Sequence, residues 1–188
     1  MENNAFVIAF DTETTGVGKD DEILQLSIVD QNEDTVWDEY YMPRFKKRWN
    51  EAAKFNHISY GFVKNKPNII EQKAQIEEIF ATADLVIGYN IGFDLRMLQQ
   101  NGIQIDLDKE KYVDLMLPFA KMYQKEKRGD TIKLQALKTC AEWYGFRDFD
   151  WHNAVADAEA TMACYKAMVG YKHINILDVY SGRHWIVE

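Results

Sequence analysis

Four carboxylic acids and one histidine could do chemistry together if the chain folded so as to gather them: Asp11, Glu13, Asp94, His152 and Asp157. Gathered carboxylates repel one another, so they need a divalent cation between them, and hard oxygen ligands favour Mg²⁺ or Mn²⁺. Two such ions can stabilise both the attacking water and the leaving oxygen when a phosphodiester is cleaved. That water also needs a proton acceptor, and imidazole accepts protons near neutral pH.

The first acidic pair, Asp11 and Glu13, follows the apolar run 5–10, which predicts a short buried strand that stops at Asp11. The two-residue period of a strand places both carboxylates on the same face. A solvated strand end is the alternative explanation for such a pair. The polar turn that follows, Thr14-Thr15-Gly16, makes the pattern more specific.

The third acid, Asp94, falls in a predicted helix over residues 93–100. On that helix it shares a face with Met97, Leu98 and Asn101. A carboxylate on the packing side of a helix is costly unless it has a partner or a cation. The alternative is an N-cap or first-turn acid that interacts favourably with the helix dipole.

The last two candidates, His152 and Asp157, lie five residues apart, about 140° around an α-helix, so they cannot share a face within one helix. They can converge if His152 stands in the loop before a helix and Asp157 projects from its second turn. Asn153 could then cap the start of that helix. The alternative is an ordinary loop histidine beside Trp151.

Positioning these side chains requires a sheet with helices packed against it. Alternating and apolar runs predict three strands joined by short turns, which is typical of an antiparallel meander, followed by two short buried strands. The predicted strands cover residues 5–10, 22–29, 35–42, 85–88 and 112–115. The predicted helices cover residues 46–55, 69–80, 93–100, 117–125, 132–144 and 154–169. This order predicts an α/β fold in which helices flank a mixed sheet.

The composition agrees with one globular domain. The chain has 188 residues, of which 47% are hydrophobic and 28% charged. Cys140 and Cys164 form no CxxC pair, which argues against a disulfide scaffold or a cysteine zinc site and favours a reducing compartment. No apolar run approaches the ~20 residues of a membrane span, and the N-terminus lacks the features of a signal peptide. We therefore expect a cytoplasmic protein that has no membrane partner.

The negative charge is local. The net charge is −8, yet residues 11–39 alone hold ten acids and one lysine, a net of −9. The rest of the chain is therefore close to neutral, at +1. A focus of acids of this kind is consistent with a metal site, which would reverse the sign of the field that a phosphate meets.

Three sequence blocks resemble the exonuclease motifs of the DEDDh family. They are Phe10-Asp11-Thr12-Glu13-Thr14-Thr15-Gly16, Asn90-Ile91-Gly92-Phe93-Asp94 and His152-Asn153-Ala154-Val155-Ala156-Asp157. The third block fits H-x-A-x-x-D, the histidine variant of the motif. In pattern the chain is most similar to the DnaQ-like proofreading epsilon subunits of bacterial DNA polymerase III. The resemblance covers roughly residues 5–170.

The resemblance implies an RNase H-like fold, with a five-stranded sheet of an antiparallel meander plus parallel strands. It also implies a 3′-to-5′ exonuclease that uses two divalent cations, Mg²⁺ or Mn²⁺. Carried over by position, the metal ligands would be Asp11, Glu13, Asp94 and Asp157, and His152 would be the general base.

The same resemblance suggests residues that bind substrate. Thr14 and Thr15 would lie beside the terminal nucleotide, and Asn90 would stand near the substrate strand. Asp114 matches a family acid after the last strand, which we interpret as structural. The family often has His-Gly-Ile-Thr where this chain has Asn56-His57-Ile58-Ser59, without the glycine. His57 is a candidate for contact with the terminal nucleotide, and the alternative is a cation at a helix C-terminus.

The expected activity is release of nucleoside 5′-monophosphates from a single-stranded or frayed 3′ end of DNA, in proofreading, repair or DNA degradation. The alternatives are an RNA 3′-to-5′ exonuclease and a non-catalytic nucleic-acid-binding module. We expect the exonuclease domain over residues 1–170 and a tail over residues 171–188 that packs on the domain or binds a partner. The sequence leaves open whether a DNA polymerase is that partner.

Two basic segments are secondary evidence for nucleic-acid binding. Residues 44–49, Arg-Phe-Lys-Lys-Arg-Trp, mix cations with aromatic rings, and residues 121–133 hold five cations. A solvated helix end or loop is the alternative explanation for each segment.

Overall fold

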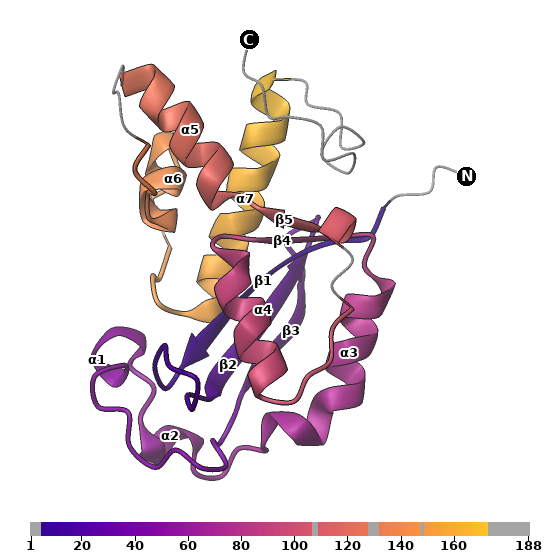
Figure 1. The fold of residues 1–188 in the computed structure, drawn as a ribbon, viewed down its shortest axis with the longest axis vertical. Coiled ribbons are helices and arrows are strands. Elements are labelled where there is room, and N and C mark those ends of the chain that lie inside the picture. The colour runs from indigo at the N-terminus through magenta and orange to yellow at the C-terminus, as the bar shows by residue number, and fades with distance from the viewer. Residues whose placement is uncertain (1–4, 107–108, 128–131, 148, 173–188) are drawn as a thin grey trace.

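The computed structural model describes residues 5–106, 109–127, 132–147 and 149–172. At its centre is a five-stranded mixed sheet with the strand order β3-β2-β1-β4-β5 (Figure 1). The strands are β1 (Val7–Thr14), β2 (Ile23–Asp30), β3 (Thr35–Tyr40), β4 (Leu85–Gly88) and β5 (Tyr112–Asp114). The first three pair antiparallel, while β4 pairs parallel with both β1 and β5. The predicted fold class is confirmed.

Helices cover both faces of the sheet. They are α1 (Ala53–Asn56), α2 (Tyr60–Val63), α3 (Lys73–Thr82), α4 (Ile91–Gln100), α5 (Met116–Lys127), α6 (Leu137–Trp143) and α7 (Ala154–Lys172), with the 3₁₀ turns η1 (Ile69–Gln72) and η2 (Lys109–Lys111). Within the described ranges, no helix is long and apolar enough to span a membrane.

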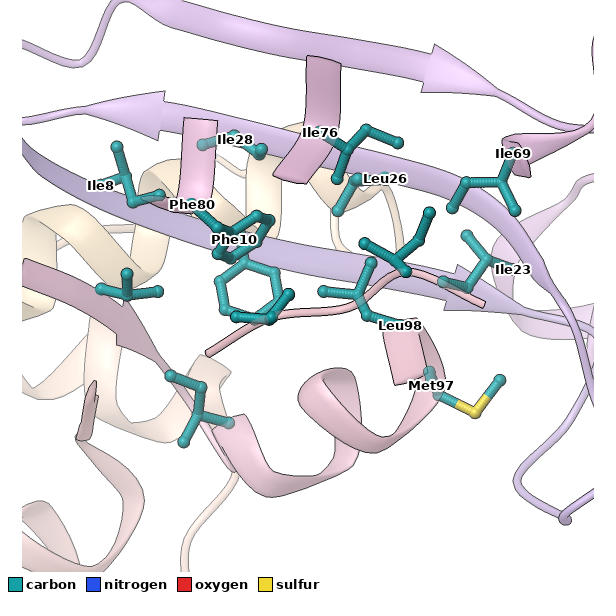
Figure 2. Packing of buried hydrophobic residues seen from close by; sticks show 14 of the residues in the cluster. Ile8, Phe10, Ile23, Leu26, Ile28, Ile69, Ile76, Phe80, Met97 and Leu98 are labelled. Atoms are coloured by element: carbon teal, nitrogen blue, oxygen red, sulfur yellow. The ribbon is translucent and has the colours of Figure 1, made fainter. Parts of the chain in front are cut away.

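Strand periodicity separates the apolar residues of the sheet into two cores. On one face Ile8 and Phe10 of β1 pack with residues of α3 and α4 (Figure 2). The rings of Phe10 and Phe80 meet edge to face there, with centroids 4.9 Å apart. On the other face Val7 and Ala9 pack with α7 and α6. Odd-numbered and even-numbered residues of β1 therefore face different helices.

The pairing of β1 is uneven along its length. β2 accompanies β1 from Ile8 to Thr14, whereas β4 pairs with it only over Val7–Ala9. Continued pairing with β2 also explains why β1 is longer than predicted, because the ladder carries the strand through the polar residues to Thr14. The prediction that the strand stops at Asp11 was wrong. Beyond Ala9, one edge of β1 is left without a neighbouring strand.

The predicted helix over residues 46–55 was wrong. Within that range only Ala53–Phe55 are helical, as part of α1. The cause is a buried carboxylate: the oxygens of Glu22 accept hydrogen bonds from the backbone N–H groups of Arg44, Phe45 and Lys46 at 2.7–2.9 Å. N–H groups that converge on one carboxylate are held in a loop.

The remaining helices follow the prediction, with shifted ends. The helix predicted over 132–144 begins only at Leu137, and the carbonyl oxygen of Gln135 before it accepts a hydrogen bond from the Tyr89 hydroxyl at 2.9 Å. The helix predicted over 154–169 continues to Lys172. Nearly all of the predicted tail, residues 173–188, lies outside the described residues.

Candidate active site

The end of β1 carries Asp11 and Glu13 on the face covered by α7. Both are odd-numbered, so they continue the row begun by Val7 and Ala9, which pack against α7. Both side chains are only partly exposed. The sequence prediction that the two carboxylates share one face agrees with this register.

The first turn of α7 brings Asp157 to the same place. Since α7 begins at Ala154, as predicted, Asp157 lies in its first turn and not in its second. His152 stands in the turn before the helix, as predicted, and its backbone N–H donates to Asp157 Oδ2 at 3.3 Å. The other oxygen, Asp157 Oδ1, is buried and has no hydrogen-bond partner among the described residues. A buried, unpaired carboxylate oxygen is costly unless a ligand completes it.

Three of the predicted residues meet closely enough to share one ion. Ligand atoms of Glu13, His152 and Asp157 lie within 4.8 Å of one another. Carboxylate oxygens with an imidazole nitrogen form a donor set that accepts a divalent cation. This cluster contains two of the four ligands that the resemblance implies, Glu13 and Asp157, together with His152, whereas Asp11 and Asp94 are not part of it. The unpaired Asp157 Oδ1 is the atom best placed to accept a cation.

Asp94 reaches the site from the other side of β1. Its side chain is 4% exposed, and Oδ1 accepts from both the backbone N–H and the hydroxyl of Thr12, at 3.1 and 2.6 Å. Thr12 lies on the edge of β1 that β4 leaves unpaired. The Asp94 carboxylate therefore takes the place of a strand carbonyl at that edge. Met97, Leu98 and Asn101 are buried with it, as the helix pattern predicted.

The electrostatics show that the four acids crowd one another. Burial and then the charges of Asp94, Asp157 and Glu13 raise the pKa of Asp11 well above its ordinary value. Burial raises the pKa of Glu13 to about 8, with Asp157 adding to the effect. Burial likewise raises the pKa of Asp94 to about 7, against the hydrogen bonds from Thr12. The pKa of Asp157 rises with burial to about 6. Four acids that ionise reluctantly are well suited to a cation, which favours their charged forms.

Gln25 fixes the start of α7, and the sequence analysis did not identify it. Its side chain, 1% exposed on β2, accepts from the Ala154 N–H through Oε1 at 3.2 Å. Its Nε2 donates to Asn153 Oδ1 and Asp38 Oδ1, at 3.2 and 2.9 Å. The predicted cap by Asn153 is also present, since its Oδ1 accepts from the Val155 N–H at 3.3 Å. The signal was a glutamine inside an otherwise apolar strand.

Gln25 matters because of what precedes the helix. His152 has φ 66°, a left-handed conformation that is uncommon for a residue with a side chain. The hydrogen bonds that join Gln25 to Asn153 and Ala154, together with the bond from the His152 N–H to Asp157, keep the histidine in that conformation. Gln25 therefore acts on His152 indirectly, through the Asn153 side chain and the Ala154 backbone N–H.

Asn56 is the second residue that the sequence analysis missed. It is 8% exposed, and its Nδ2 donates to the carbonyl oxygen of Thr14 at 3.1 Å. A hydrogen bond from its side chain also lowers the pKa of Glu13, against the larger effect of burial. The signal lay in the family's His-Gly pair, which corresponds to Asn56-His57. His57 has φ 57°, the left-handed conformation that a glycine adopts easily.

His57 itself is exposed and closes α1, so its C-terminal position on a helix agrees with the alternative explanation. It also lines a pocket of about 210 Å³ together with His152. His57 therefore combines a position at a helix end with a place in the pocket beside His152.

The other predicted binding residues, Thr14, Thr15 and Asn90, make local hydrogen bonds. Thr15 uses its N–H and hydroxyl within the turn, bonding Glu22 and Asp21. The Thr14 hydroxyl donates to the carbonyl of Gly16 at 2.8 Å. Asp114 Oδ1 accepts from the N–H of Asn90 and from the N–H of Met116, both at 2.9 Å, which agrees with a structural role for this acid.

Curated relatives include an RNA exonuclease and a DNA polymerase. The chain is 29% identical over 167 residues to RNA exonuclease 4 of Saccharomyces cerevisiae. It is 27% identical over 172 residues to a PolC-type DNA polymerase III of Caldanaerobacter subterraneus subsp. tengcongensis. These alignments cover 85% and 86% of the chain, but only 53% and 11% of the respective relatives.

Solved structures share the fold. E. coli exonuclease I in a complex with single-stranded DNA has a TM-score of 0.73 at 18% identity, over 93% of this chain and 42% of that one. Exonuclease X in complex with 5′-overhanging duplex DNA has a TM-score of 0.66 at 17% identity, over 93% of this chain and 99% of that one. Such low identities establish the fold and nothing finer.

A family model for exonucleases, RNase_T, matches residues 8–165. This range contains all three sequence blocks, both strand partners of β1 and the start of α7. Since the match spans most of the chain, the protein belongs to the RNase_T exonuclease family, in agreement with the DEDDh, DnaQ-like pattern of its sequence.

Proposed function

We propose that this protein is a metal-dependent 3′-to-5′ exonuclease that releases nucleoside 5′-monophosphates from the 3′ end of DNA. The observation that carries the proposal is the meeting of Glu13, His152 and Asp157 within 4.8 Å, beside a buried Asp157 oxygen without a described partner. Membership of the RNase_T family supports exonuclease activity in general. The 3′-to-5′ polarity and the DNA substrate are the more specific parts of the proposal.

The carboxylates are proposed to hold the ions. Asp11, Glu13, Asp94 and Asp157 would bind two Mg²⁺ or Mn²⁺ ions, and raised pKa values in the free protein support a cation as their missing partner. When bound, such ions supply positive charge against the charge that develops on the phosphate oxygens. Asp94 would first have to share the oxygen that now accepts from Thr12, or use its other one.

His152 is proposed as the proton acceptor. Its ring is exposed at the mouth of the cluster, and its backbone is fixed by the bond to Asp157 and by the Gln25-bound start of α7. An imidazole held beside the acids can take the proton from a water as that water attacks the terminal phosphodiester. The leaving group is the 3′ oxygen of the preceding nucleotide.

RNA is the second candidate substrate, because the 29% identical yeast relative is an RNA exonuclease. The DNA proposal has support of a similar kind in the PolC-type relative and in the DNA complexes of the structural neighbours. The two candidates share chemistry and differ only in what the site accepts at the sugar.

The deciding experiment uses single strands of DNA and RNA of one sequence, each labelled at the 5′ end, with Mg²⁺ or with EDTA. A ladder of shortened 5′-labelled strands with Mg²⁺ alone supports 3′-to-5′ polarity. Immediate release of labelled mononucleotide would show the opposite polarity. The ratio of the DNA and RNA rates identifies the preferred substrate, and no cleavage of either would leave the non-catalytic binding module as the better proposal.

We also propose residues 1–170 as the exonuclease domain, which the family match over residues 8–165 supports. The proposal that residues 171–188 pack on the domain or bind a partner is testable by removing them. Activity that persists without a change in melting temperature would assign the tail to a partner.

A further inference from the structure

Residues 44–66, here called the basic lobe, carry a charge opposite to that of the rest of the chain. They hold seven Lys or Arg and one Glu, a net of +6, while all other residues together carry −14. The lobe comprises the loop held by Glu22, then α1 and α2, and it is basic well beyond the Arg44–Trp49 run. A local positive surface on an acidic protein is the footprint expected for a bound polyanion.

The lobe also exposes aromatic rings. Among the described residues, nine large hydrophobic side chains are exposed, and four of them belong to the lobe: Phe45 at 77%, Phe55 at 62%, Phe62 at 53% and Tyr60 at 49%. The buried core beneath the lobe consists of other residues: Trp49, Ile58 and Val63 packed with Leu24. Tyr60 and Phe62 each touch its edge, at Trp49 and Tyr40, and still leave about half of their side chains exposed. Exposed rings between cations are typical of surfaces on which nucleic-acid bases stack.

The lobe begins at the active site. Asn56 donates to the carbonyl of Thr14, and the Phe55 ring lies 6.1 Å from the His152 ring. From there the lobe extends beyond the end of β1, at the opposite end of the molecule from α5 (Figure 1). A strand whose 3′ end occupies the site would therefore meet the lobe with its neighbouring nucleotides.

Two cations of the lobe that line one pocket are available for phosphates. Lys46 pairs with Asp21, and Lys54 pairs with Glu51. Lys47 and Arg48 form no ion pair with any described acid, and with Tyr60 they line a pocket of about 290 Å³. Two unpaired cations and an exposed ring around one pocket provide both kinds of contact that a single strand uses.

We propose that the basic lobe binds the single-stranded nucleic acid on the 5′ side of the nucleotide being removed. Lys47 and Arg48 contact its phosphates, and Tyr60 stacks on a base. This inference rests on the proposed function, because it assumes that the 3′ end lies at Glu13 and Asp157. If the inference holds, only a strand of several nucleotides reaches the lobe, so the lobe favours long substrates over short ones.

The test compares substrates by length in the full chain. The short substrate is the p-nitrophenyl ester of thymidine 5′-monophosphate, and the long one is an oligothymidylate of about 20 nucleotides, which exceeds the ~4–16 nucleotides that such surfaces typically cover. Lys47→Glu with Arg48→Glu should lower kcat/KM about 10-fold or more on the long strand and leave the ester unchanged. The salt dependence of strand binding should flatten by about 1.4 in log–log slope, at about 0.7 for each lost phosphate contact.

The matched control reverses two exposed lysines on the other basic segment, residues 121–133, by Lys121→Glu with Lys133→Glu, which changes the net charge by the same amount. Equal losses in this control would show a general charge effect and overturn the proposal. Equal losses on the ester and the long strand would do so as well. Tyr60→Ala should lower long-strand affinity about 10-fold, and unchanged affinity would remove the stacking contact.

The two proposals can fail separately. Strand binding measured by fluorescence anisotropy in EDTA needs no catalysis, so it tests the lobe even if the wild type proves inactive. An inactive wild type whose strand binding still depends on Lys47 and Arg48 would overturn the proposed function and support the lobe. An active wild type with lobe-independent binding would do the reverse.

Discussion

The acidic cluster and the basic lobe meet at the end of β1, yet they are built in opposite ways. The acids are largely buried, their pKa values are raised, and Asp157 Oδ1 has no described partner. The cations of the lobe are mostly exposed, and their loop is fastened by the buried Glu22 carboxylate. The cluster therefore costs folding energy when it ionises, whereas the lobe does not. The comparison predicts that an Asp157 variant loses activity while gaining stability, and that variants of Lys47 and Arg48 change neither stability nor the chemical step.

The largest expected effect comes from Asp157→Asn. It should lower kcat by about 10³-fold to 10⁵-fold, since a lost metal ligand removes several kcal/mol of transition-state stabilisation. In EDTA at pH 8 the same variant should melt at a higher temperature than the wild type, because it removes a buried charge. Differential scanning fluorimetry and steady-state kinetics measure both. A variant that is inactive and also less stable without metal would break the comparison.

His152→Ala should lower kcat by about 10²-fold to 10⁴-fold if the imidazole takes the proton. Its melting temperature should barely change, because the ring is exposed. The pH–rate profile should also lose the limb that reports the general base. A normal kcat with a higher KM would instead assign His152 to substrate binding. His152 would then share the role proposed for the lobe and would take no part in the chemical step.

Gln25 tests whether the cluster depends on positioning. Gln25→Leu should lower kcat by about 10-fold to 10²-fold with little change in KM, because the start of α7 loses its hydrogen bonds. Gln25→Glu would place a second acid beside Asp38 and should also be impaired. Adding Asp38→Asn to it should recover most of kcat, since the amide and the carboxylate then exchange places. If the double variant stays as slow as Gln25→Glu, Gln25 has only a packing role.

The smallest effect concerns pH and metal. A carboxyl whose pKa is raised on folding gives stability that is fully present below its unfolded pKa and is lost as pH rises through the folded one. For Glu13, Asp94 and Asp157 the folded values are about 8, 7 and 6. The melting temperature in EDTA should therefore fall by several degrees between pH 5 and pH 8, relative to Asp157→Asn. Millimolar Mg²⁺ should recover the loss at pH 8. A flat profile in EDTA would contradict a crowded acidic cluster.

Local patterns predicted most of the sheet. The predicted strand 85–88 coincides with β4, and the antiparallel meander follows from alternation alone. Asp94 was placed correctly on the packing face because helical periodicity is a local property. The four acids were identified as candidate ligands from their residue types and from their match to the family's motifs.

Long-range hydrogen bonds account for what the sequence did not predict. The segment after Pro43 has helical composition, but Glu22, more than twenty residues earlier, holds it in a loop. Asn56 and Gln25 owe their positions to Thr14 and Ala154, which are 42 and 129 residues away. Such contacts depend on the assembled sheet, so no window of neighbouring residues reveals them.

The bond between Asp94 and Thr12 has a consequence for how variants of this site should be interpreted. The Asp94 side chain accepts a backbone hydrogen bond at the unpaired edge of β1, and it is also a candidate metal ligand. Replacing it would leave an amide hydrogen without an acceptor, so lost turnover in an Asp94 variant would mix a structural injury with a chemical one. Asp157, whose spare oxygen supports nothing else in the described structure, is the cleaner residue for dissecting the reaction.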